Sequence, residues 1–460
     1  MSRRAGFGVA VALAATLAGN ASAAETTNAE LLERIKKLED QSVYVKDLEQ
    51  EVQLLKRQIE VKEEAETSKG PSPVIGAGPD GFFLQSADKN FALKLRGYTQ
   101  LDSRFFVGES DQNNVDTFIF RRVRPIVEGT VGGWADFKIM PDFANSQLVL
   151  QDAYTNLRPF GPIAQLQIGK YKAPFGLERL QSATALTFIE RGLPTNLVPN
   201  RDLGFQLWGD VGGGLLTYQL AVMNGVTDGG SADSDNNDGK DIIARVFAHP
   251  FVDTTVEPLQ GLGLGVAATW GRETGTPSNY KTSGQQTFFS WVNGTSLDND
   301  RFRISPQAYW YWGPFGLLGE YVFTSTDVER TAAGRKVSAG PDANSWQLAA
   351  SYVLTGENAS YRGVTPRENF SPSKGTWGAF EFAARYDELS IAEEAFDKGF
   401  ANPSTSAQEA QGATLGVNWY MNRFLKFVVN YEHTWFEGGA PNGGDRDAED
   451  LVSTRFQLNY

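Results

Sequence analysis

Hydrophobic and polar side chains alternate with a period of two from residue 91 to the end of the chain. The first such segment places Phe91, Leu93 and Leu95 on one face and Lys94 and Arg96 on the other. Alternation of this kind predicts β-strands, because successive side chains of a strand point to opposite faces. In a soluble sandwich the apolar faces would form a core. In a membrane barrel they would meet lipid, and the charged faces would line a lumen.

The pattern recurs in an even number of segments, as single-chain bacterial barrels require. We predict sixteen strands near 91–106, 117–132, 134–140, 147–158, 163–172, 203–210, 214–223, 240–251, 260–272, 301–312, 315–325, 343–354, 375–388, 412–421, 424–436 and 449–460. The connections alternate between long polar loops and short turns such as Gly133 and Gly313-Pro314. Two connections on the short side, 252–259 and 355–374, are longer than this rule predicts. The last strand ends in Phe456, Leu458 and Tyr460, an amphipathic aromatic terminus typical of such barrels.

The N-terminus predicts export from the cytoplasm. Arg3 and Arg4 precede an apolar stretch, and Ala21-Ser22-Ala23 forms a small-x-small cleavage site, so residues 1–23 are predicted to be a signal peptide cleaved near Ala23. A short membrane anchor is the alternative. The chain has no Cys and two His, which excludes thiol chemistry and leaves little for metal or triad catalysis. Its formal net charge of −13 argues against a nucleic-acid partner.

A helix is predicted between the export signal and the strands. Residues 28–66 contain no Gly or Pro, and Val45, Leu48, Val52, Leu55 and Ile59 follow the 3-4 spacing of a heptad seam. We interpret the segment as a periplasmic coiled coil; a single solvated amphipathic helix is the alternative. Residues 67–81 are rich in Pro, Gly and Ser and are interpreted as a linker to a barrel domain at 82–460. A G-x-G-x-x-G spacing in that linker lacks the flanking strand and helix of a nucleotide site.

Basic residues are concentrated in the first half of the predicted barrel. Residues 94–201 contain thirteen Lys or Arg and ten acids, a net charge of +3 in a chain of −13. Cationic side chains in a pore favour anions, and the guanidinium fork suits phosphate oxygens. The alternative is that these charges pair with acids and only solvate the interior. The predicted anion-guiding residues are Lys94, Arg96, Arg122, Arg124, Lys138, Arg158, Lys170, Lys172, Arg179, Arg191 and Arg201.

The connection 173–202 is too apolar for a loop in water. It carries Phe175, Leu186, Phe188, Leu193 and Leu197 among its charged residues. We expect it to fold into the lumen and narrow the pore; packing on a neighbouring subunit is the alternative. The acidic stretch 233–239 resembles the start of a calcium loop, but it lacks the closing Glu and is interpreted as solvated surface.

Several stretches resemble the phosphate-selective porin O and P family. They are FALKLRGYTQLD (91–102), FIFRRVRPIVEGT (118–130), GKYKAPFGLERLQSATALTFIERGLPTNLVPNRDLG (169–204), and YVLTGE (352–357) followed by GAFEFAARYDEL (378–389). The resemblance implies a homotrimer of sixteen-stranded barrels, an infolded third loop at the constriction, and Arg and Lys residues that guide anions. Lys170 and Lys172, beside that loop, are the best candidates for a phosphate site.

These observations predict an all-β, sixteen-stranded antiparallel transmembrane barrel with an N-terminal helix, located in the bacterial outer membrane. Its function would be passive diffusion of small anions, including phosphate or polyphosphate, in contact with lipid and lipopolysaccharide. We expect no enzymatic activity, no cofactor and no metal. The alternatives are a general diffusion porin without phosphate specificity and a structural barrel tethered through the helix.

Overall fold

The computed structural model describes residues 28–68, 72–78, 81–108, 114–235, 237–332 and 334–460, in two units that divide between Ser72 and Pro73. The predicted signal peptide, residues 1–23, lies outside the described residues. The first unit contains one long helix, α1 (Asn28–Ser68), as predicted for 28–66. Side chains of the heptad seam, such as Leu48 and Ile59, are 42 % and 56 % exposed. No helix in the described part of the chain has the length and apolar character needed to span a bilayer.

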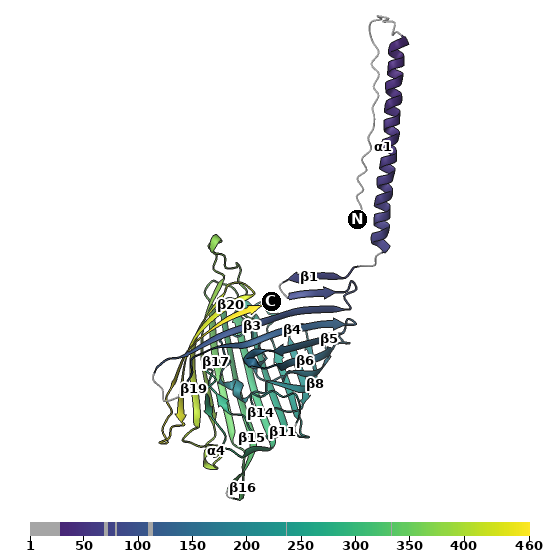
Figure 1. Cartoon of the computed structure of the whole chain (residues 1–460). Helices are drawn as coiled ribbons and strands as arrows, with labels where there is room; N and C mark the ends of the chain where they lie inside the picture. The colour runs from purple at the N-terminus through teal and green to yellow at the C-terminus, as the bar shows by residue number, and fades with distance from the viewer. Residues whose placement is uncertain (1–27, 69–71, 79–80, 109–113, 236, 333) are drawn as a thin grey trace. The chain divides into compact units, whose positions relative to one another are not determined.

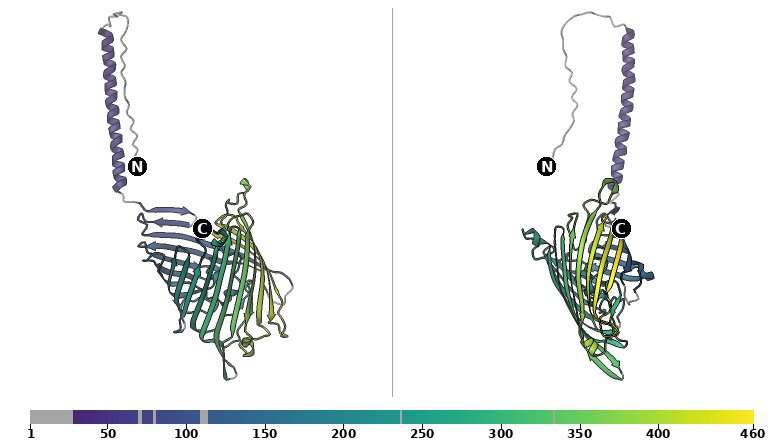
Figure 2. Two further views of the ribbon diagram at one scale, coloured as in Figure 1. Left: turned by 180° about the vertical axis from the view of Figure 1, so that it is seen from behind. Right: turned by 90° about the vertical axis from the view of Figure 1, so that its left-hand side faces the viewer.

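The second unit is a closed barrel of sixteen antiparallel strands, and each predicted strand is present (Figure 1). The barrel strands are β3 (Ala92–Phe106), β4 (Thr117–Val131), β5 (Ala135–Asp142), β6 (Val149–Leu157), β7 (Gln165–Lys172), β8 (Arg201–Val211), β9 (Leu216–Met223), β10 (Asp241–Ala248), β11 (Leu262–Gly275), β14 (Thr295–Trp312), β15 (Phe315–Ala332), β17 (Asp342–Val353), β18 (Ala379–Ile391), β19 (Ala407–Tyr420), β20 (Leu425–Gly438) and β21 (Glu449–Asn459). Figure 2 shows them running obliquely around the barrel. Outward positions such as Phe205 and Leu207 are exposed and apolar, whereas the inward Gln206 between them is buried.

The first and last strands close the barrel. Tyr98 of β3 is paired with Asn459 of β21, and the register continues to Phe106 opposite Leu451. Gly97 and the terminal Tyr460 exchange two backbone hydrogen bonds of 2.7 and 2.9 Å. Closure therefore satisfies the backbone donors and acceptors of both edge strands, which a bilayer requires.

A hairpin of β1 (Val74–Gly78) and β2 (Gly81–Gln85) occupies part of the segment that the sequence analysis interpreted as a linker. β3 begins at Ala92, but β21 pairs with it only from Tyr98 onward, so the first residues of β3 have a free edge. β2 pairs with this edge from Ala92 to Leu95. Gly81 adopts φ +93°, and a Cβ there would lie 2.3 Å from the carbonyl oxygen of Leu95. The glycine spacing therefore serves a tight hairpin, formed because the longer β3 leaves backbone groups to pair.

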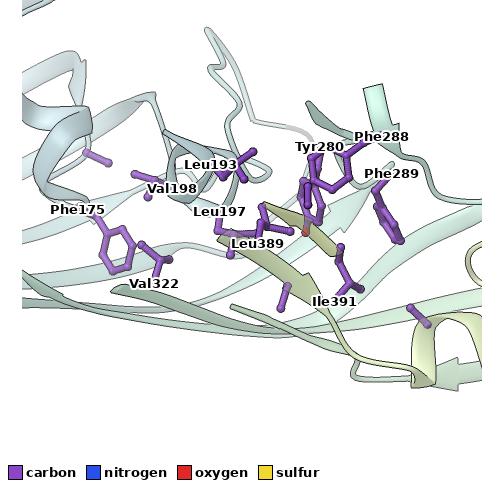
Figure 3. Packing of buried hydrophobic residues seen from close by; sticks show 14 of the residues in the cluster. Phe175, Leu193, Leu197, Val198, Tyr280, Phe288, Phe289, Val322, Leu389 and Ile391 are labelled. Carbon is purple, nitrogen blue, oxygen red and sulfur yellow. The ribbon is translucent and has the colours of Figure 1, made fainter. Parts of the chain in front are cut away.

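A hydrophobic core lies inside the barrel rather than between layers (Figure 3). Phe175 and Leu197, from the connection between β7 and β8, pack in one cluster with the inward-facing Val322 of β15 and Leu389 of β18. Phe288 belongs to the same cluster and comes from a small hairpin of β12 (Tyr280–Lys281) and β13 (Thr287–Phe289) in the connection after β11. These two long connections lie at the same end of the barrel, which we expect to face the cell exterior, and the short turns lie at the opposite end, which we expect to be periplasmic. Both long connections thus fold inward and bury apolar side chains against the barrel wall.

Candidate functional site

The segment 173–202 lies within the lumen and is held there through its own backbone. It contains two short helices, α2 (Leu177–Leu180) and η2 (Leu193–Leu197). Its N–H and C=O groups bond to inward-facing side chains of β15, β18, β20 and β21. The partners are Glu320 for the amide of Leu177, Asp387 for Leu193, Asn430 for Ile189, Lys426 for the carbonyl of Leu186 and Arg455 for the carbonyl of Ile189. These bonds fix the segment to the second half of the wall, while basic residues of the first half line the cavities that remain beside it.

The long connection between β17 and β18 supports this segment from the periplasmic side. The hydroxyl of Tyr361 donates to the carbonyl of Leu177 at 2.5 Å, and the side chain of Gln181 donates to the carbonyl of Tyr361 at 2.8 Å. Ala359 and Val364 of the connection pack with Val353 in a buried cluster. The unexpected length of this periplasmic turn is therefore explained by its contact with the infolded segment.

Three cavities follow one another past the infolded segment. The outer cavity has a volume of about 340 Å³, the middle one about 580 Å³ and the inner one about 920 Å³. The outer and middle cavities share Arg121, Arg122, Arg179, Arg191 and Asn200 in their linings. The middle and inner cavities share Arg96, Ser182 and Thr184. The residues common to the outer and middle cavities mark the place where these two spaces meet.

The middle cavity is strongly cationic. Two acids, Asp142 and Asp152, lie among its lining residues, against nine cations: Arg96, Arg121, Arg122, Arg124, Lys138, Lys172, Arg179, Arg191 and Arg201. Asp142 pairs with Arg124 at 2.7 Å. Asp152 pairs with both Lys138 and Arg201, at 2.9 and 2.7 Å. Arg96 pairs with Glu128 at 2.7 Å. These four cations are each neutralised at least in part by a carboxylate.

Three other cations of the middle cavity have backbone carbonyls rather than carboxylates as partners within the described residues. Lys172 donates to the carbonyl of Gln181 at 2.8 Å, and Arg191 donates to the carbonyls of Glu178 and Gln181. Arg179 donates to the carbonyl of Thr195 at 3.0 Å, while its Nε is buried with no hydrogen-bond partner. Burial and the neighbouring Arg191 hold the pKa of the Arg179 guanidinium well below its usual range. A desolvated cation cluster of this kind favours an anion beside it.

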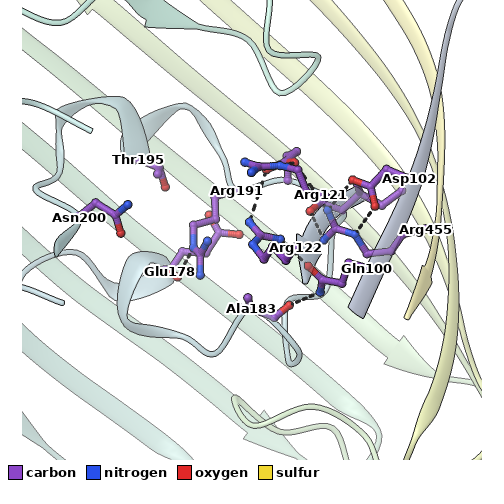
Figure 4. A network of polar contacts seen from close by, with 12 residues as sticks. Gln100, Asp102, Arg121, Arg122, Glu178, Ala183, Arg191, Thr195, Asn200 and Arg455 are labelled. Atoms are coloured by element: carbon purple, nitrogen blue, oxygen red, sulfur yellow. Dashed lines mark hydrogen bonds and ion pairs between the residues drawn. The ribbon is translucent and has the colours of Figure 1, made fainter. Parts of the chain in front are cut away.

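Arg121 is a lumen residue that strict alternation assigns to the outer face. Gln100 is paired with Arg122 while Leu101 is paired with Phe120, so Arg121 is the extra residue of a β-bulge. The bulge turns both arginines inward, where Arg121 pairs with Glu190 at 2.5 Å (Figure 4). The sequence contains one signal of this bulge, the arginine doublet at 121–122. In an unbroken strand one of the two would face lipid, which costs about 2–4 kcal/mol at mid-bilayer. The doublet 121–122 therefore argued against unbroken alternation.

The carboxylate of Glu190 contacts four arginines, of which Figure 4 labels Arg121, Arg122 and Arg455. Its carboxylate lies 3.3 Å from Arg104, 3.9 Å from Arg122 and 3.6 Å from Arg455, in addition to Arg121. Burial acts to raise the pKa of Glu190, but the charges of Arg121, Arg122 and Arg455 outweigh it and hold the pKa well below its usual range. One carboxylate therefore anchors the infolded segment to four arginines without cancelling their combined charge.

Three of the predicted anion-guiding residues, Lys94, Arg158 and Lys170, lie outside the linings of the three cavities. Lys170 shares the strand parity of the outward-facing Leu166, is buried, and pairs with Asp233 of the acidic stretch that resembled a calcium loop. Arg158 follows β6 at the periplasmic end, 38 % exposed, and pairs with Asp136. Lys94 lies where β3 is flanked by β2 and β4, outside the linings of the three cavities. The assignment of Lys170 as a best candidate for a phosphate site stays a prediction, and its ion-pair partner among the described residues is Asp233.

The acids of the second half explain the negative net charge. Arg301 and Arg303 of β14 are fully buried and pair with Asp228, Asp241 and Glu273. Arg385 of β18 likewise pairs with Asp387 and Glu432. These five acids are thus engaged in ion pairs, and Asp387 also accepts from the backbone of the infolded segment. Among the described residues, no group of three or more His, Asp or Glu side chains is arranged to hold a metal ion.

The barrel and its cationic lumen agree with comparisons to known proteins. A family model described as phosphate-selective porin O and P matches residues 93–460. The chain belongs to this family. Porin O of Pseudomonas aeruginosa is 25 % identical over 416 residues, which cover 83 % of this chain and 91 % of that protein. The family and the fold establish the chain as an outer-membrane porin.

Solved structures share the fold at low sequence identity. The outer-membrane channel DcaP of Acinetobacter baumannii superposes with a TM-score of 0.53 at 11 % identity, over 82 % of this chain and 99 % of that one. An anion-selective porin from Comamonas acidovorans has a TM-score of 0.50 at 14 % identity, over 80 % of this chain and all of that one. The trimer form of Vibrio cholerae OmpT also reaches 0.50, at 10 % identity, over 80 % and 99 %. These similarities concern the barrel architecture.

Proposed function

We propose that this porin is an anion-preferring diffusion pore narrowed by the segment 173–202, with phosphate or polyphosphate among its solutes. The observation that carries the proposal is the position of Arg179 and Arg191. Both line the outer and the middle cavity, and both have backbone carbonyls instead of carboxylates as partners. An anion passing between the cavities meets two guanidinium groups that have no carboxylate as a hydrogen-bond partner among the described residues.

The lining supports weak binding at several successive positions rather than one tight site. Lys172, Arg179 and Arg191 form a central group, and the carboxylate-paired Arg96 and Arg201 extend the basic surface along the same wall. Conduction requires that an ion is attracted enough to enter but not held so tightly that it stays. Guanidinium groups donate in pairs to two oxygens, which suits phosphate. The name of the relative Porin O and its phosphate-selective family agree with this assignment.

The decisive experiment is a reversal-potential measurement in planar bilayers under a KCl gradient. We expect a potential of anion sign, and reduced current on addition of millimolar phosphate but not of sulfate. The combined variant K172Q/R179Q/R191Q should lose most of the anion preference, whereas K170Q serves as a matched control that keeps it. A reversal potential of cation sign would refute the proposal. Equal effects of phosphate and sulfate would favour a general diffusion porin, and absence of conductance would favour a structural barrel.

We further propose that the mature chain begins after Ala23 and assembles as a trimer in contact with lipid and lipopolysaccharide. The helix α1 would contribute a coiled coil through its heptad seam, with the following Pro- and Gly-containing stretch as the connection to the barrel. The exposed apolar side chains of that seam and the trimer form of the OmpT relative support this assignment. The mass of the detergent-extracted complex, measured with and without residues 28–66, tests it; a monomer in both cases would contradict it.

A further inference from the structure

The inner cavity is lined by a cluster of aromatic rings. Tyr309 of β14 lies at its centre, with ring centroids 5.1 Å from Tyr361, 5.1 Å from Phe247 and 5.4 Å from Tyr311. The Tyr309 and Tyr361 rings are stacked, with an interplanar angle of 22°. All four rings are among the residues that line the cavity of about 920 Å³. They therefore present apolar surface to the solute path.

These rings differ from the outer aromatic side chains of the same strand. Tyr309 and Tyr311 share the inward parity of the buried Gln307, whereas Trp312 has the outward parity and is 44 % exposed. An outward ring at a strand end belongs to the interfacial girdle of a membrane barrel. The inward cluster has no such role, because lipid does not reach the lumen.

The same cavity carries positive charge without acids. Its lining contains Arg96, Arg245 and Arg362, and none of its lining residues is Asp or Glu. Arg245 donates to the neutral side chains of Gln307 and Gln219, both at 3.0 Å, and its guanidinium carbon lies 4.8 Å from the Phe247 ring centroid. Arg362 lies on the exposed periplasmic connection. Of the three, Arg96 has a carboxylate partner among the described residues.

We propose that this inner cavity is a second binding site on the pore path, for anions that carry an aromatic ring. The ring of such a solute would stack on the Tyr309–Tyr361 pair, and its phosphate or carboxylate would lie against Arg245 and Arg362. Inorganic phosphate can contact only the arginines, because it has no ring to stack. The site should therefore bind aryl anions more tightly than inorganic ones. The inference rests on the proposed function, because both require anions to enter the lumen.

The hydrogen bonds around Tyr309 hold the stacking surface in place. His249 approaches the carbonyl of Gly214 through Nδ1 at 2.8 Å and the hydroxyl of Tyr309 through Nε2 at 2.7 Å. Since a carbonyl only accepts, Nδ1 carries a proton, and in the neutral imidazole Nε2 then accepts from the tyrosine. A preorganised ring costs less conformational entropy on binding than a mobile one.

The test is blockade of single-channel current by phenyl phosphate, added to the periplasmic side, with inorganic phosphate and neutral phenol as comparisons. We expect phenyl phosphate to block at a concentration about two- to tenfold below that of inorganic phosphate, since aromatic contacts contribute on this scale. Phenol should not block. Benzoate, in parallel, distinguishes a preference for phosphate from one for any aryl anion.

Two variants locate the effect. Tyr309→Leu should remove the advantage of phenyl phosphate over phosphate, while Tyr309→Phe keeps the ring and should retain it. Because Arg362 is exposed, Arg362→Gln should assemble even if Tyr309→Leu does not. This variant should weaken blockade by both aryl anions. Equal blockade by phenyl phosphate and phosphate in the wild type would overturn the inference. So would an unchanged ratio in Tyr309→Leu together with unchanged blockade by the aryl anions in Arg362→Gln. A cation-sign reversal potential would instead refute the proposed function itself.

Discussion

Replacing Arg179 with Gln isolates the local charge at the passage between the outer and middle cavities. The guanidinium has one hydrogen bond to the Thr195 carbonyl and a buried Nε without a partner, so the substitution removes charge with little loss of bonding. Arg158→Gln is the matched control, because it removes the same formal charge from the periplasmic end of β6, where Asp136 already pairs with it. The comparison separates position from net charge.

The expected magnitude follows from Coulomb's law. A chloride ion passing about 5 Å from the guanidinium gains about 0.8 kcal/mol at the dielectric constant of water. Screening at about 0.15 M salt reduces this value to roughly 0.45 kcal/mol. Potassium is repelled by the same amount, so the loss of Arg179 changes the difference between the two ions by about 0.9 kcal/mol, or about four- to fivefold in permeability ratio.

The assay is the reversal potential of single channels under a KCl gradient. Arg179→Gln should lower the chloride-to-potassium permeability ratio by the factor above, Arg179→Lys should retain it, and Arg158→Gln should change it by less than about twofold because exposed, paired charges contribute little. Repeating the measurement at 1 M KCl should diminish the difference, since the Debye length falls to about 3 Å. An unchanged ratio in Arg179→Gln, or an equal change in Arg158→Gln, would refute the reasoning.

Four further outcomes are expected. Glu190→Gln should increase anion preference by removing the carboxylate that contacts all four arginines of its cluster, and should lower the free energy of unfolding by about 3–5 kcal/mol in urea titrations because buried arginines lose a partner; a less anion-selective variant would contradict this. Because the folded-state pKa of Glu190 is depressed, its stabilising contribution is fully present above its unfolded pKa of about 4.3 and is lost as the pH falls through the lower folded value. Selectivity that depends on this group should therefore be constant from about pH 7 to about pH 5. A reversal potential that changes with pH in this range in the wild type, but not in Glu190→Gln, would exclude this assignment. Tyr361→Phe removes the hydrogen bond to Leu177 and should cost about 0.5–1.5 kcal/mol and increase open-channel current noise; noise equal to that of the wild type would show that the periplasmic connection does not steady the infolded segment. A peptide of residues 28–66 should gain helicity with concentration, and Val52→Asp should abolish that gain; helicity independent of concentration would rule out the coiled coil.

Local pattern alone predicted the barrel strands. Each of the sixteen was located because alternation is a property of neighbouring residues, and β3 with Lys94, Arg96 and Tyr98 inward has the parity expected from its sequence. The hairpin β1–β2 was missed for a related reason. Its pairing depends on the part of the β3 edge that β21 leaves unpaired, and the register of barrel closure decides which residues these are.

The sequence by itself determined the alternation, the helix and the concentration of basic residues in the first half, because these are recorded in composition and spacing. Only the tertiary structure decided which of those residues act together. A β-bulge at Arg121 reverses what parity predicts, and Lys170 pairs with Asp233 outside the linings of the three cavities. Whether a cation is left without a carboxylate, as Arg179 is, depends on residues brought near it by closure of the barrel and by the infolded segment. Charge pairing across distant strands is a long-range property, so no local pattern contains it.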